Sequence, residues 1–440
     1  MAIENKVIQK NFVDKELFRI ISFFFNIIKL SIIQPEKQTL IHYLSFIPRL
    51  PYLSRKDSFL IMERFTIYNP TRLHFGEGVV DKLGESVRKQ GLKVMLIYGQ
   101  GSVKKYGYYD RVVALLKSNN LDVITYGGIK PNPVIEDVRD AVELGRKEKV
   151  DVVVALGGGS VIDSAKIISL SIASGYDGWE IMKYKVFPTS AIPLICVLTL
   201  AATGTEMNFA AVVQNNKTGE KIGFVNDLIY PLESFLDPAY TVSVPRDYTA
   251  YGVVDLIAHA LENYFGQGEP PVIDQITFDI IKDAMKWGPM LLENLDDVEL
   301  RANIMLDATL ALNGLTRYGK ANGDWGVHML GHEISLLYDT PHGATLSIAY
   351  IAWLRLQKDR IPERIIKLGK NLFGVETVDD TISGLRRFFQ SVHSPVKLSE
   401  AGIGKDQRQK IINQMNKNEV SGVHHKLSQT DRELLIDFML

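Results

Sequence analysis

Between residues 93 and 236 the chain alternates short apolar runs rich in β-branched residues with longer helical patterns. Helical segments such as "PVIEDVRDAVELGRKEK" (133–149) separate several of the apolar runs. Strand, loop and helix repeated in this order predict a parallel sheet covered by helices, with ligand-binding loops at the carboxyl ends of the strands. The runs expected to form strands are "KVMLIYG" (93–99), "LDVITYGG" (121–128), "VDVVVALGGG" (150–159) and "AIPLICVLTL" (191–200).

From about residue 245 the pattern changes to long helical periods, among them "TAYGVVDLIAHALENYF" (249–265) and "ELRANIMLDATLAL" (299–312). The stretch "DPAYTVSVPRD" (237–247) contains two prolines and is predicted to link the two patterns. A chain of 440 residues is also too long for one ordinary hydrophobic core. The sequence therefore predicts an α/β domain over residues 62–240 and an all-helical domain over residues 241–440.

The first 61 residues have a different character from the rest of the chain. "FRIISFFFNIIKLSII" (18–33) is apolar, but it contains Arg19, Asn26 and Lys29 and is shorter than the roughly 20 residues that a spanning helix needs. A short buried or interfacial helix is the alternative to a membrane segment. The pattern restarts at Met62 with "MERFTIYNPTRLHFGEG", which is typical of an opening strand. We expect residues 1–61 to be an appendage outside the catalytic unit, as would follow from an upstream start codon.

The charge balance and the cysteine content bear on the partners and on the cellular compartment of the protein. Lys and Arg total 50 against 51 Asp and Glu, and no basic stretch is interleaved with aromatic residues, which argues against a nucleic-acid partner. The single cysteine, Cys196, lies in an apolar run and has no second cysteine to pair with. A chain without disulfides suits a reducing compartment, so we expect a cytoplasmic protein in which Cys196 is a buried small hydrophobe.

Two glycine-rich loops follow predicted strands. "VDVVVALGGGSVIDSAK" runs from a strand through three glycines into a helix, where close backbone approach and unpaired N–H groups can bind a phosphate. A glycine run after a strand can also be only a tight turn. "IYGQGSVKKYG" (97–107) repeats the arrangement, and two such loops fit a dinucleotide. The second loop has Gly101, Ser102, Lys104 and Lys105 instead of an acidic residue, which favours NADP(H) over NAD(H).

The histidines of the helical half suggest a metal site. Asp255 and His259 are four residues apart in a helical pattern, so both side chains project from one face. His328 and His332 repeat this spacing, and His342 follows in "TPHG". One such histidine alone would be read as a surface or core residue, but two pairs and a third histidine favour a metal site. A carboxylate with several imidazoles can hold Fe(II), Zn(II), Mn(II) or Co(II), and the residues alone do not choose among these metals.

Taken together, these motifs resemble the iron-containing, group III alcohol dehydrogenases, and most closely the butanol dehydrogenase-like, NADPH-dependent aldehyde reductase branch. The resemblance covers residues 62–440 and rests on "GGGSVIDSAK", "TLAATGTEMN", "LDPAYT", "VVDLIAHALENY" and "GVHMLGHEISLLYDTPHG" in the family's order. It implies that residues 62–240 are a dinucleotide-binding domain and residues 241–440 a helical metal- and substrate-binding domain. Gln100 and Ala201 depart from the family's usual glycine and proline in the cofactor loops.

The resemblance also implies roles for individual residues. The metal ligands would be Asp255, His259, His328 and His342, and His332 would help to relay a proton near the nicotinamide without being a ligand. The implied cofactor contacts are Gly99, Gly101, Ser102, Asn132, Gly158, Gly159, Ser160, Asp163, Thr199, Thr203, Asn208, Lys221 and Tyr240.

The expected activity is a metal-dependent hydride transfer between NADP(H) and an aldehyde/primary alcohol pair, with aldehyde reduction as the main direction. Two alternatives stay open at this point. One is a lyase that uses NAD and metal as the related dehydroquinate synthases do, although "ATGTEMNFAAVV" supplies little positive charge for a phosphorylated acid. The other is a non-catalytic, membrane-associated protein on the same fold. The exposed β segment "RFTIYNP" (64–70), which relatives pair across subunits, implies a homodimer.

Overall fold

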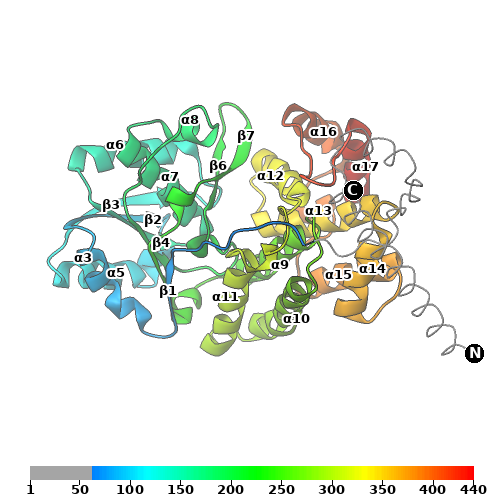
Figure 1. Cartoon of the computed structure of the whole chain (residues 1–440), viewed down its shortest axis with the longest axis horizontal. Helices are drawn as coiled ribbons and strands as arrows, with labels where there is room; N and C mark the ends of the chain where they lie inside the picture. The colour runs from blue at the N-terminus through cyan, green and yellow to red at the C-terminus, as the bar shows by residue number, and fades with distance from the viewer. Residues whose placement is uncertain (1–61) are drawn as a thin grey trace, which may run out of the picture. The chain divides into compact units, whose positions relative to one another are not determined.

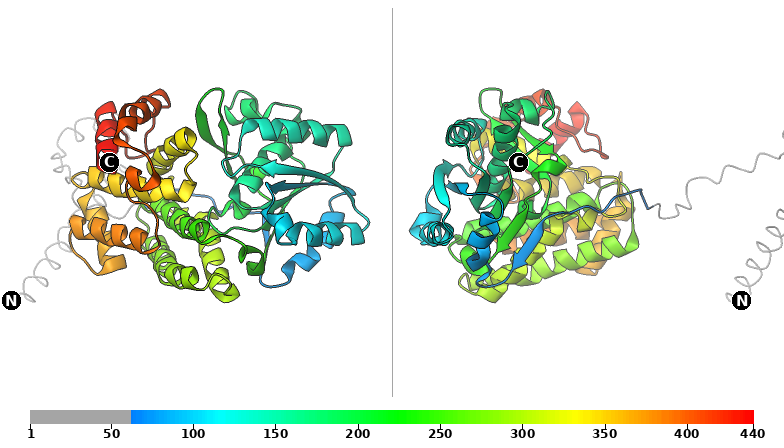
Figure 2. Two further views of the ribbon diagram at one scale, coloured as in Figure 1. Left: turned by 180° about the vertical axis from the view of Figure 1, so that it is seen from behind. Right: turned by 60° about the vertical axis from the view of Figure 1, so that its left-hand side comes forward.

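The computed structural model describes residues 62–440, and these belong to one compact unit that begins at Leu60. The expectation that residues 1–61 form an appendage concerns a segment outside the described residues. The described unit has a sheet with helices on either face and a bundle of helices beside it (Figures 1 and 2). The fold class predicted from the sequence is therefore confirmed.

A six-stranded sheet, all of its strand pairs parallel, forms the centre of the α/β part. Its strand order is β1-β8-β5-β4-β2-β3, so the carboxyl ends of β2 and β4 lie side by side (Figure 1). The four strands expected from the apolar runs are all present in it. The strands are β1 (Arg72–Phe75), β2 (Lys93–Gly99), β3 (Asp122–Ile129), β4 (Val152–Gly157), β5 (Leu194–Leu198) and β8 (Glu233–Leu236).

Residues of the central strands are buried on both faces, which explains why these strands are continuously apolar. Val94 and Leu96 of β2 pack in a core with α3 (Leu83–Arg88) and α5 (Tyr108–Ser118). Met95 of the same strand enters a second core with α6 (Ile135–Glu148) and α7 (Gly159–Ser174). Cys196 in β5 belongs to this second core, and burial raises the pKa of its thiol to about 12.

A two-stranded antiparallel hairpin, β6 (Ala210–Asn215) and β7 (Glu220–Val225), forms a second sheet, separate from the parallel one. The sequence analysis did not predict it. Its turn needs Gly219, whose φ of 65° lies in the left-handed region. Short helices complete this part, namely α4 (Ser102–Lys105), α8 (Gly178–Met182), and the 3₁₀ helices η1 (Val79–Lys82), η2 (Thr205–Met207), η3 (Asp227–Ile229) and η4 (Pro238–Thr241).

The segment "RFTIYNP" (64–70) is not the strand that the sequence predicted. Pro70 has no N–H for a strand ladder, and the neighbouring Asn69 donates its side-chain amide to the carbonyl oxygens of Met207 and Asn313. Phe65 stacks on Tyr318 at 5.8 Å between ring centroids. The segment is therefore tied to loops instead of to a neighbouring strand, and the first strand is the shorter β1.

The remainder of the chain is helical, as expected, and shares one apolar core that includes Tyr264, Phe278, Trp353 and Phe389. Within residues 62–440, no helix is long and apolar enough to cross a membrane. The helices are α9 (Arg246–Tyr264), α10 (Pro271–Glu293), α11 (Val298–Leu312), α12 (Gly326–Tyr338), α13 (His342–Gln357), α14 (Pro362–Phe373), α15 (Val378–Ser391), α16 (Arg408–Lys417) and α17 (Gln429–Met439), with η5 (Leu315–Arg317), η6 (Leu398–Ala401) and η7 (Lys405–Gln407).

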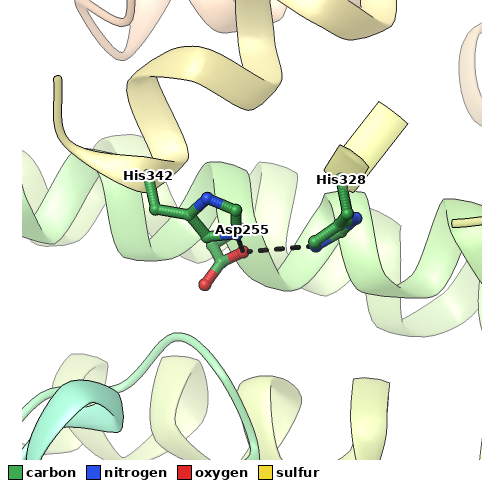
Figure 3. Close-up of side chains that lie close together, drawn as sticks. All are labelled: Asp255, His328 and His342. Carbon is green, nitrogen blue, oxygen red and sulfur yellow. Dashed lines mark ion pairs between the residues drawn. The ribbon is translucent and has the colours of Figure 1, made fainter. Parts of the chain in front are cut away.

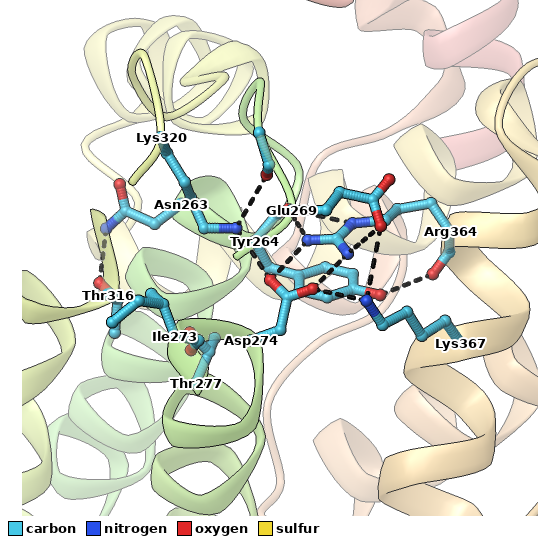
Figure 4. A network of polar contacts seen from close by, with 11 residues as sticks. Asn263, Tyr264, Glu269, Ile273, Asp274, Thr277, Thr316, Lys320, Arg364 and Lys367 are labelled. Carbon is cyan, nitrogen blue, oxygen red and sulfur yellow. Dashed lines mark hydrogen bonds and ion pairs between the residues drawn. The ribbon is translucent and has the colours of Figure 1, made fainter. Parts of the chain in front are cut away.

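A buried ionic network fastens α10 to α14 (Figure 4). The carboxylate of Asp274 accepts hydrogen bonds from Lys320, Arg364 and Lys367 at 2.5 to 2.9 Å. The Arg364 guanidinium also lies 3.5 Å from the centre of the Tyr264 ring. Burial raises the pKa of Asp274, but these cations reverse the effect and hold the pKa well below its usual range. Burial lowers the pKa of Lys320 to about 8.

Asp274→Ala is expected to lower the free energy of unfolding by about 3–5 kcal/mol, because it leaves buried cations without their counter-charge. Urea unfolding followed by far-UV circular dichroism measures the change. Asp379→Ala is the matched control, since its ion pair with Lys358 at 2.6 Å is exposed and should contribute less than about 1 kcal/mol. Equal, small losses in both variants would contradict a stabilising role for the network.

Candidate metal centre and cofactor site

Three helices bring the predicted metal ligands together. Asp255 and His259 lie one turn apart on α9, and both are nearly fully buried, at 3% and 5% exposed. His328 comes from the first turn of α12, and His342 is the first residue of α13. Pro341 precedes His342 as the N-cap of α13 and ends the turn between the two helices.

The side chains converge on one carboxylate oxygen, Asp255 Oδ1. His328 Nε2 and His342 Nε2 each lie 3.8 Å from this atom, and His259 Nδ1 lies 3.6 Å from it. Figure 3 shows His328 and His342 approaching Asp255 from different helices. One ligand atom each from Asp255, His328 and His342 lies within 4.8 Å of the others. His259 is not part of this tightest group, but its ring stacks on that of His328 at 4.6 Å between centroids.

Unsatisfied buried atoms in this group fit a cation. Asp255 Oδ1, His259 Nδ1, His328 Nε2 and His342 Nδ1 have no hydrogen-bond partner among the described residues. An unpaired buried polar atom costs about 1–3 kcal/mol, so several such atoms in one place suit the binding of a cation. One carboxylate and three imidazoles are the ligand types that Fe(II) and Zn(II) accept.

The electrostatics of the group agree with this fit. Burial raises the pKa of Asp255, but the interactions with the surrounding histidines outweigh this effect. The pKa is therefore well below its usual value, and the carboxylate is ionised. Burial lowers the pKa of His259 to about 4 and that of His342 well below its usual value, so both imidazoles are neutral at pH 7. His328 differs, because two nearby carboxylates outweigh burial and raise its pKa to about 9. Cation binding would displace a proton from this ring.

His332 lies outside the group that surrounds Asp255. It follows His328 by one turn of α12, and its ring centroid is 5.2 Å from that of His342 and 6.4 Å from that of His328. Burial, followed by the positive charge of Lys221, lowers the pKa of His332 well below its usual value. The ring is therefore neutral and close to the candidate ligands without joining them.

The glycine-rich loops lie at the carboxyl ends of neighbouring strands. Gly157 ends β4 and α7 begins at Gly159, with no side chain capping its first N–H groups. A Cβ atom on Gly159 would lie 2.6 Å from Thr203 Cγ2, so only glycine allows this loop to approach the segment that contains Thr199 and Thr203. The side chain of Ser160 donates a hydrogen bond to the carbonyl of Pro131.

The second glycine-rich loop, residues 97–107, follows β2, the neighbour of β4 in the sheet. Gly99 ends the strand, Gly101 precedes α4, and Ser102 is exposed at the start of that helix. Lys104 Nζ lies 4.9 Å from the centre of the Tyr98 ring. The structure thus places the two predicted phosphate-binding loops at one edge of the sheet.

Asn132 and Lys221 connect the α/β part with α12. Lys221 Nζ donates to Asn132 Oδ1 at 2.9 Å and to Ser335 Oγ at 3.2 Å. Asn132 Nδ2 in turn donates to Asp339 Oδ1 at 2.6 Å, at the end of α12. Burial lowers the pKa of Lys221 to about 8. These two predicted cofactor residues therefore lie within hydrogen-bonding reach of the helix that carries His328 and His332.

The side chains of two other predicted cofactor residues, Asp163 and Asn208, form hydrogen bonds within the protein. Asp163 accepts hydrogen bonds from the Thr205 hydroxyl at 2.6 Å and from the Val212 amide at 2.9 Å. Asn208 accepts from Lys166 and donates to the carbonyl of Gly204. The structure does not direct these two side chains toward the glycine-rich loops, and their direct contact with a cofactor stays a prediction.

Tyr240 stacks on Tyr108 at 4.6 Å, and its hydroxyl has no hydrogen-bond partner among the described residues. A small pocket lies between the residues that follow Thr199 and Tyr240 in the chain and residues of α9, α10 and α11. It is lined by Leu200, Ala201, Thr241, Val244, Tyr248, Thr249, Leu291, Arg301 and Ile304.

Comparison with known families covers both parts of the chain. Residues 70–238 match the family described as iron-containing alcohol dehydrogenase, and residues 249–432 match the C-terminal region of the Fe-containing alcohol dehydrogenase family. The chain belongs to the iron-containing alcohol dehydrogenase family. As a member of this family, it is an oxidoreductase of the alcohol dehydrogenase type.

Individual relatives place this alcohol dehydrogenase in the butanol dehydrogenase-like branch. NADH-dependent butanol dehydrogenase A of Clostridium acetobutylicum is 38% identical over 358 residues, which is 79% of this chain and 92% of the relative. NADPH-dependent aldehyde reductase YqhD of Escherichia coli is 36% identical over 78% of this chain and 90% of its own length. The crystal structure of NADH-dependent butanol dehydrogenase A from Thermotoga maritima is 37% identical with a TM-score of 0.83, covering 86% of this chain and 99% of that chain.

Two buried charged residues of this alcohol dehydrogenase are not among those predicted from its sequence. Glu262 is 1% exposed and hydrogen bonds to His328, and its signal was an acidic residue three positions after His259 on the same helix. Lys166 is fully buried in α7 and donates to Thr205, Asn208 and Ala210. Lysine is rarely buried, so the sequence carried no signal for Lys166.

Gly343→Ala is expected to destabilise the enzyme by about 1–3 kcal/mol, because a Cβ there would lie 2.2 Å from the carbonyl oxygen of Tyr251 and push α13 away from α9. Thermal unfolding of the metal-free protein measures the loss. Gly223→Ala is the matched control, since a Cβ on Gly223 would meet no atom within 4 Å. A Gly343→Ala protein as stable as the control would show that α13 can shift without cost.

Proposed function

We propose that this protein is a metal-dependent oxidoreductase that transfers hydride between NADP(H) and an aldehyde/primary alcohol pair, mainly as an aldehyde reductase. The observation that carries the proposal is the convergence of imidazole nitrogens of His259, His328 and His342 on Asp255 Oδ1, which is buried and has no hydrogen-bond partner among residues 62–440. The activities for which the relatives are named, butanol dehydrogenase and aldehyde reductase, support the same substrate class.

When bound, the dinucleotide supplies the hydride, and Fe(II) or Zn(II) polarises the carbonyl group as a Lewis acid. The four side chains around Asp255 Oδ1 would hold the cation, and the burial of Asp255, His259 and His328 limits the access of bulk water to it. His332, neutral and buried beside His342, would pass a proton through an imidazole nitrogen to the product oxygen by way of water.

The glycine-rich loops would hold the dinucleotide phosphates. The uncapped N–H groups at the start of α7 and the approach of Gly159 to Thr203 suit an anion at the end of β4. Asn132 and Lys221 would orient the part of the cofactor closest to α12. The NADP preference is supported by Ser102 and Lys104 after β2, where an acidic residue would favour NAD. The relatives include NADH- and NADPH-dependent enzymes.

The lyase alternative is less well supported than hydride transfer. The chain's relatives are named as alcohol dehydrogenases, butanol dehydrogenases and aldehyde reductases. A non-catalytic role is also disfavoured, because a scaffold has no need for four unpaired ligand atoms buried in one place. We retain the homodimer as part of the proposal, supported by the exposed side chains of Phe65, Ile67 and Tyr68.

His328→Ala is expected to abolish metal retention and turnover together, since it removes one of the group's closest nitrogen atoms. His332→Ala should keep the metal and lower the rate by about 10²–10⁴-fold, the usual contribution of proton transfer. Elemental analysis after dialysis and an NADPH-oxidation assay with a panel of aldehydes measure both effects. Full activity of His328→Ala after treatment with a chelator would show that this ligand is wrongly assigned.

Ser102→Asp is expected to shift the cofactor preference toward NAD(H), because a carboxylate after β2 repels a 2′-phosphate and accepts a hydrogen bond from a 2′-hydroxyl. The ratio of kcat/KM for NADPH to that for NADH should favour NADPH in the natural protein and fall at least tenfold in the variant. An unchanged ratio would place the 2′-phosphate away from this loop. Ser118→Asp, at the exposed end of α5, controls for added charge.

A further inference from the structure

Glu262 is on α9, the helix that also carries Asp255 and His259, and it contacts the start of α12. Its carboxylate is 1% exposed and uses both oxygens. Oε2 accepts a hydrogen bond from the backbone amide of Trp325 at 2.5 Å. Oε1 is 2.9 Å from the backbone amide of His328 and 2.9 Å from Nδ1 of the same residue. One side chain therefore contacts both the backbone and the ring of a candidate ligand.

The contact with Nδ1 fixes which nitrogen of His328 faces Asp255. A carboxylate can only accept a hydrogen bond, so Nδ1 must carry the hydrogen that lies between Glu262 and His328. The other nitrogen, Nε2, lies 3.8 Å from Asp255 Oδ1 and has no hydrogen-bond partner among the described residues. Glu262 thus directs the nitrogen that can bind a cation toward the other ligand atoms.

The contacts with the two backbone amides fix the start of α12. Trp325, the N-cap of this helix, has a left-handed backbone with φ of 63°, which is unfavourable for a bulky residue, and its side chain makes no capping hydrogen bond. Glu262 supplies the cap from a different helix and places a negative charge at the N-terminus of α12. The Trp325 ring lies 5.4 Å from that of His328.

We infer that Glu262 is a positioning residue that raises the metal affinity of this centre by holding the His328 ring and the first turn of α12 in one arrangement with Asp255. The inference rests on the proposed metal site and adds a residue outside its ligand set. A ligand that has to be ordered upon binding lowers the affinity, whereas a ligand that is already held in place does not. Loss of such a partner typically lowers metal affinity by about 10–100-fold.

The test is a titration of the metal-free, full-length protein with Zn(II) alone, in competition with a chromophoric chelator and without nicotinamide. Glu262→Gln keeps the size of the side chain, but its amide nitrogen cannot accept a hydrogen bond, so the contacts with Trp325 and His328 cannot both persist. We expect its Zn(II) affinity to fall about 10–100-fold. Glu333→Gln should keep its affinity within about twofold, because Glu333 is a buried acid on α12, the helix of His328, that hydrogen bonds to Gln414 and Asn418 instead.

A second variant keeps the result interpretable if Glu262→Gln does not fold. Glu262→Asp retains the charge but shortens the side chain, so the carboxylate withdraws from His328 while it can still neutralise the start of α12. Far-UV circular dichroism of the metal-free proteins establishes that each variant is folded. The inference predicts weaker Zn(II) binding by a folded Glu262→Asp protein, with an intermediate loss. A folded variant with unchanged affinity overturns it.

His328→Ala separates the inference from the proposed function. If His328→Ala loses Zn(II) while folded Glu262 variants bind it as the natural protein does, the metal site stands and the positioning role of Glu262 is wrong. If His328→Ala also binds Zn(II) with full affinity, the proposed metal site is itself wrong. A Glu333→Gln protein as weak as Glu262→Gln would show that loss of any buried carboxylate that contacts or belongs to α12 weakens binding, which also overturns the inference.

Discussion

Within residues 62–440, the buried carboxylate oxygen Asp255 Oδ1 has no hydrogen-bond donor, and this imposes the main constraint on the structure. Leaving such an atom unpaired is costly, and the surrounding helices bring three imidazoles to within 3.6 to 3.8 Å of it without supplying a hydrogen-bond donor. The close approach of α13 to α9 at Gly343 and the turn at Pro341 both serve this convergence. The helical bundle therefore leaves polar atoms of Asp255, His259 and His328 without hydrogen bonds to residues 62–440, so that these atoms are available to bind a cation.

The α/β part meets this centre through polar contacts. Lys221 of the β6–β7 hairpin hydrogen bonds to Ser335 on α12, which also carries His328, and Asn132 hydrogen bonds to Asp339 immediately after this helix. The glycine-rich loops at the ends of β2 and β4 occupy the same edge of the sheet. The helix α12 thus receives contacts from the α/β part at its C-terminal end and supplies a candidate ligand from its N-terminal end.

Much of the fold could be predicted from periodicity, and much of the site could not. The apolar runs of β2 and β4 and the i,i+4 spacing of Asp255 and His259 each reflect local geometry, which a sequence shows directly. The same spacing cannot tell His328 from His332, because their distances to Asp255 depend on how α12 packs against α9. "RFTIYNP" has a strand-like composition, yet Pro70 and the contacts of Asn69 exclude it from the sheet. Glu262 and Lys166 gain their roles only from tertiary contacts.

The burial of Cys196 in β5 has a practical consequence for chemistry performed on this protein. The chain contains one cysteine, and this residue is 0% exposed with its thiol pKa raised to about 12. Alkylating agents and disulfides react with thiolates that solvent can reach, so the folded protein offers them no target. A cysteine introduced at any surface position would then be the sole reactive one, and fluorophores or spin labels could be attached there without first removing a native thiol.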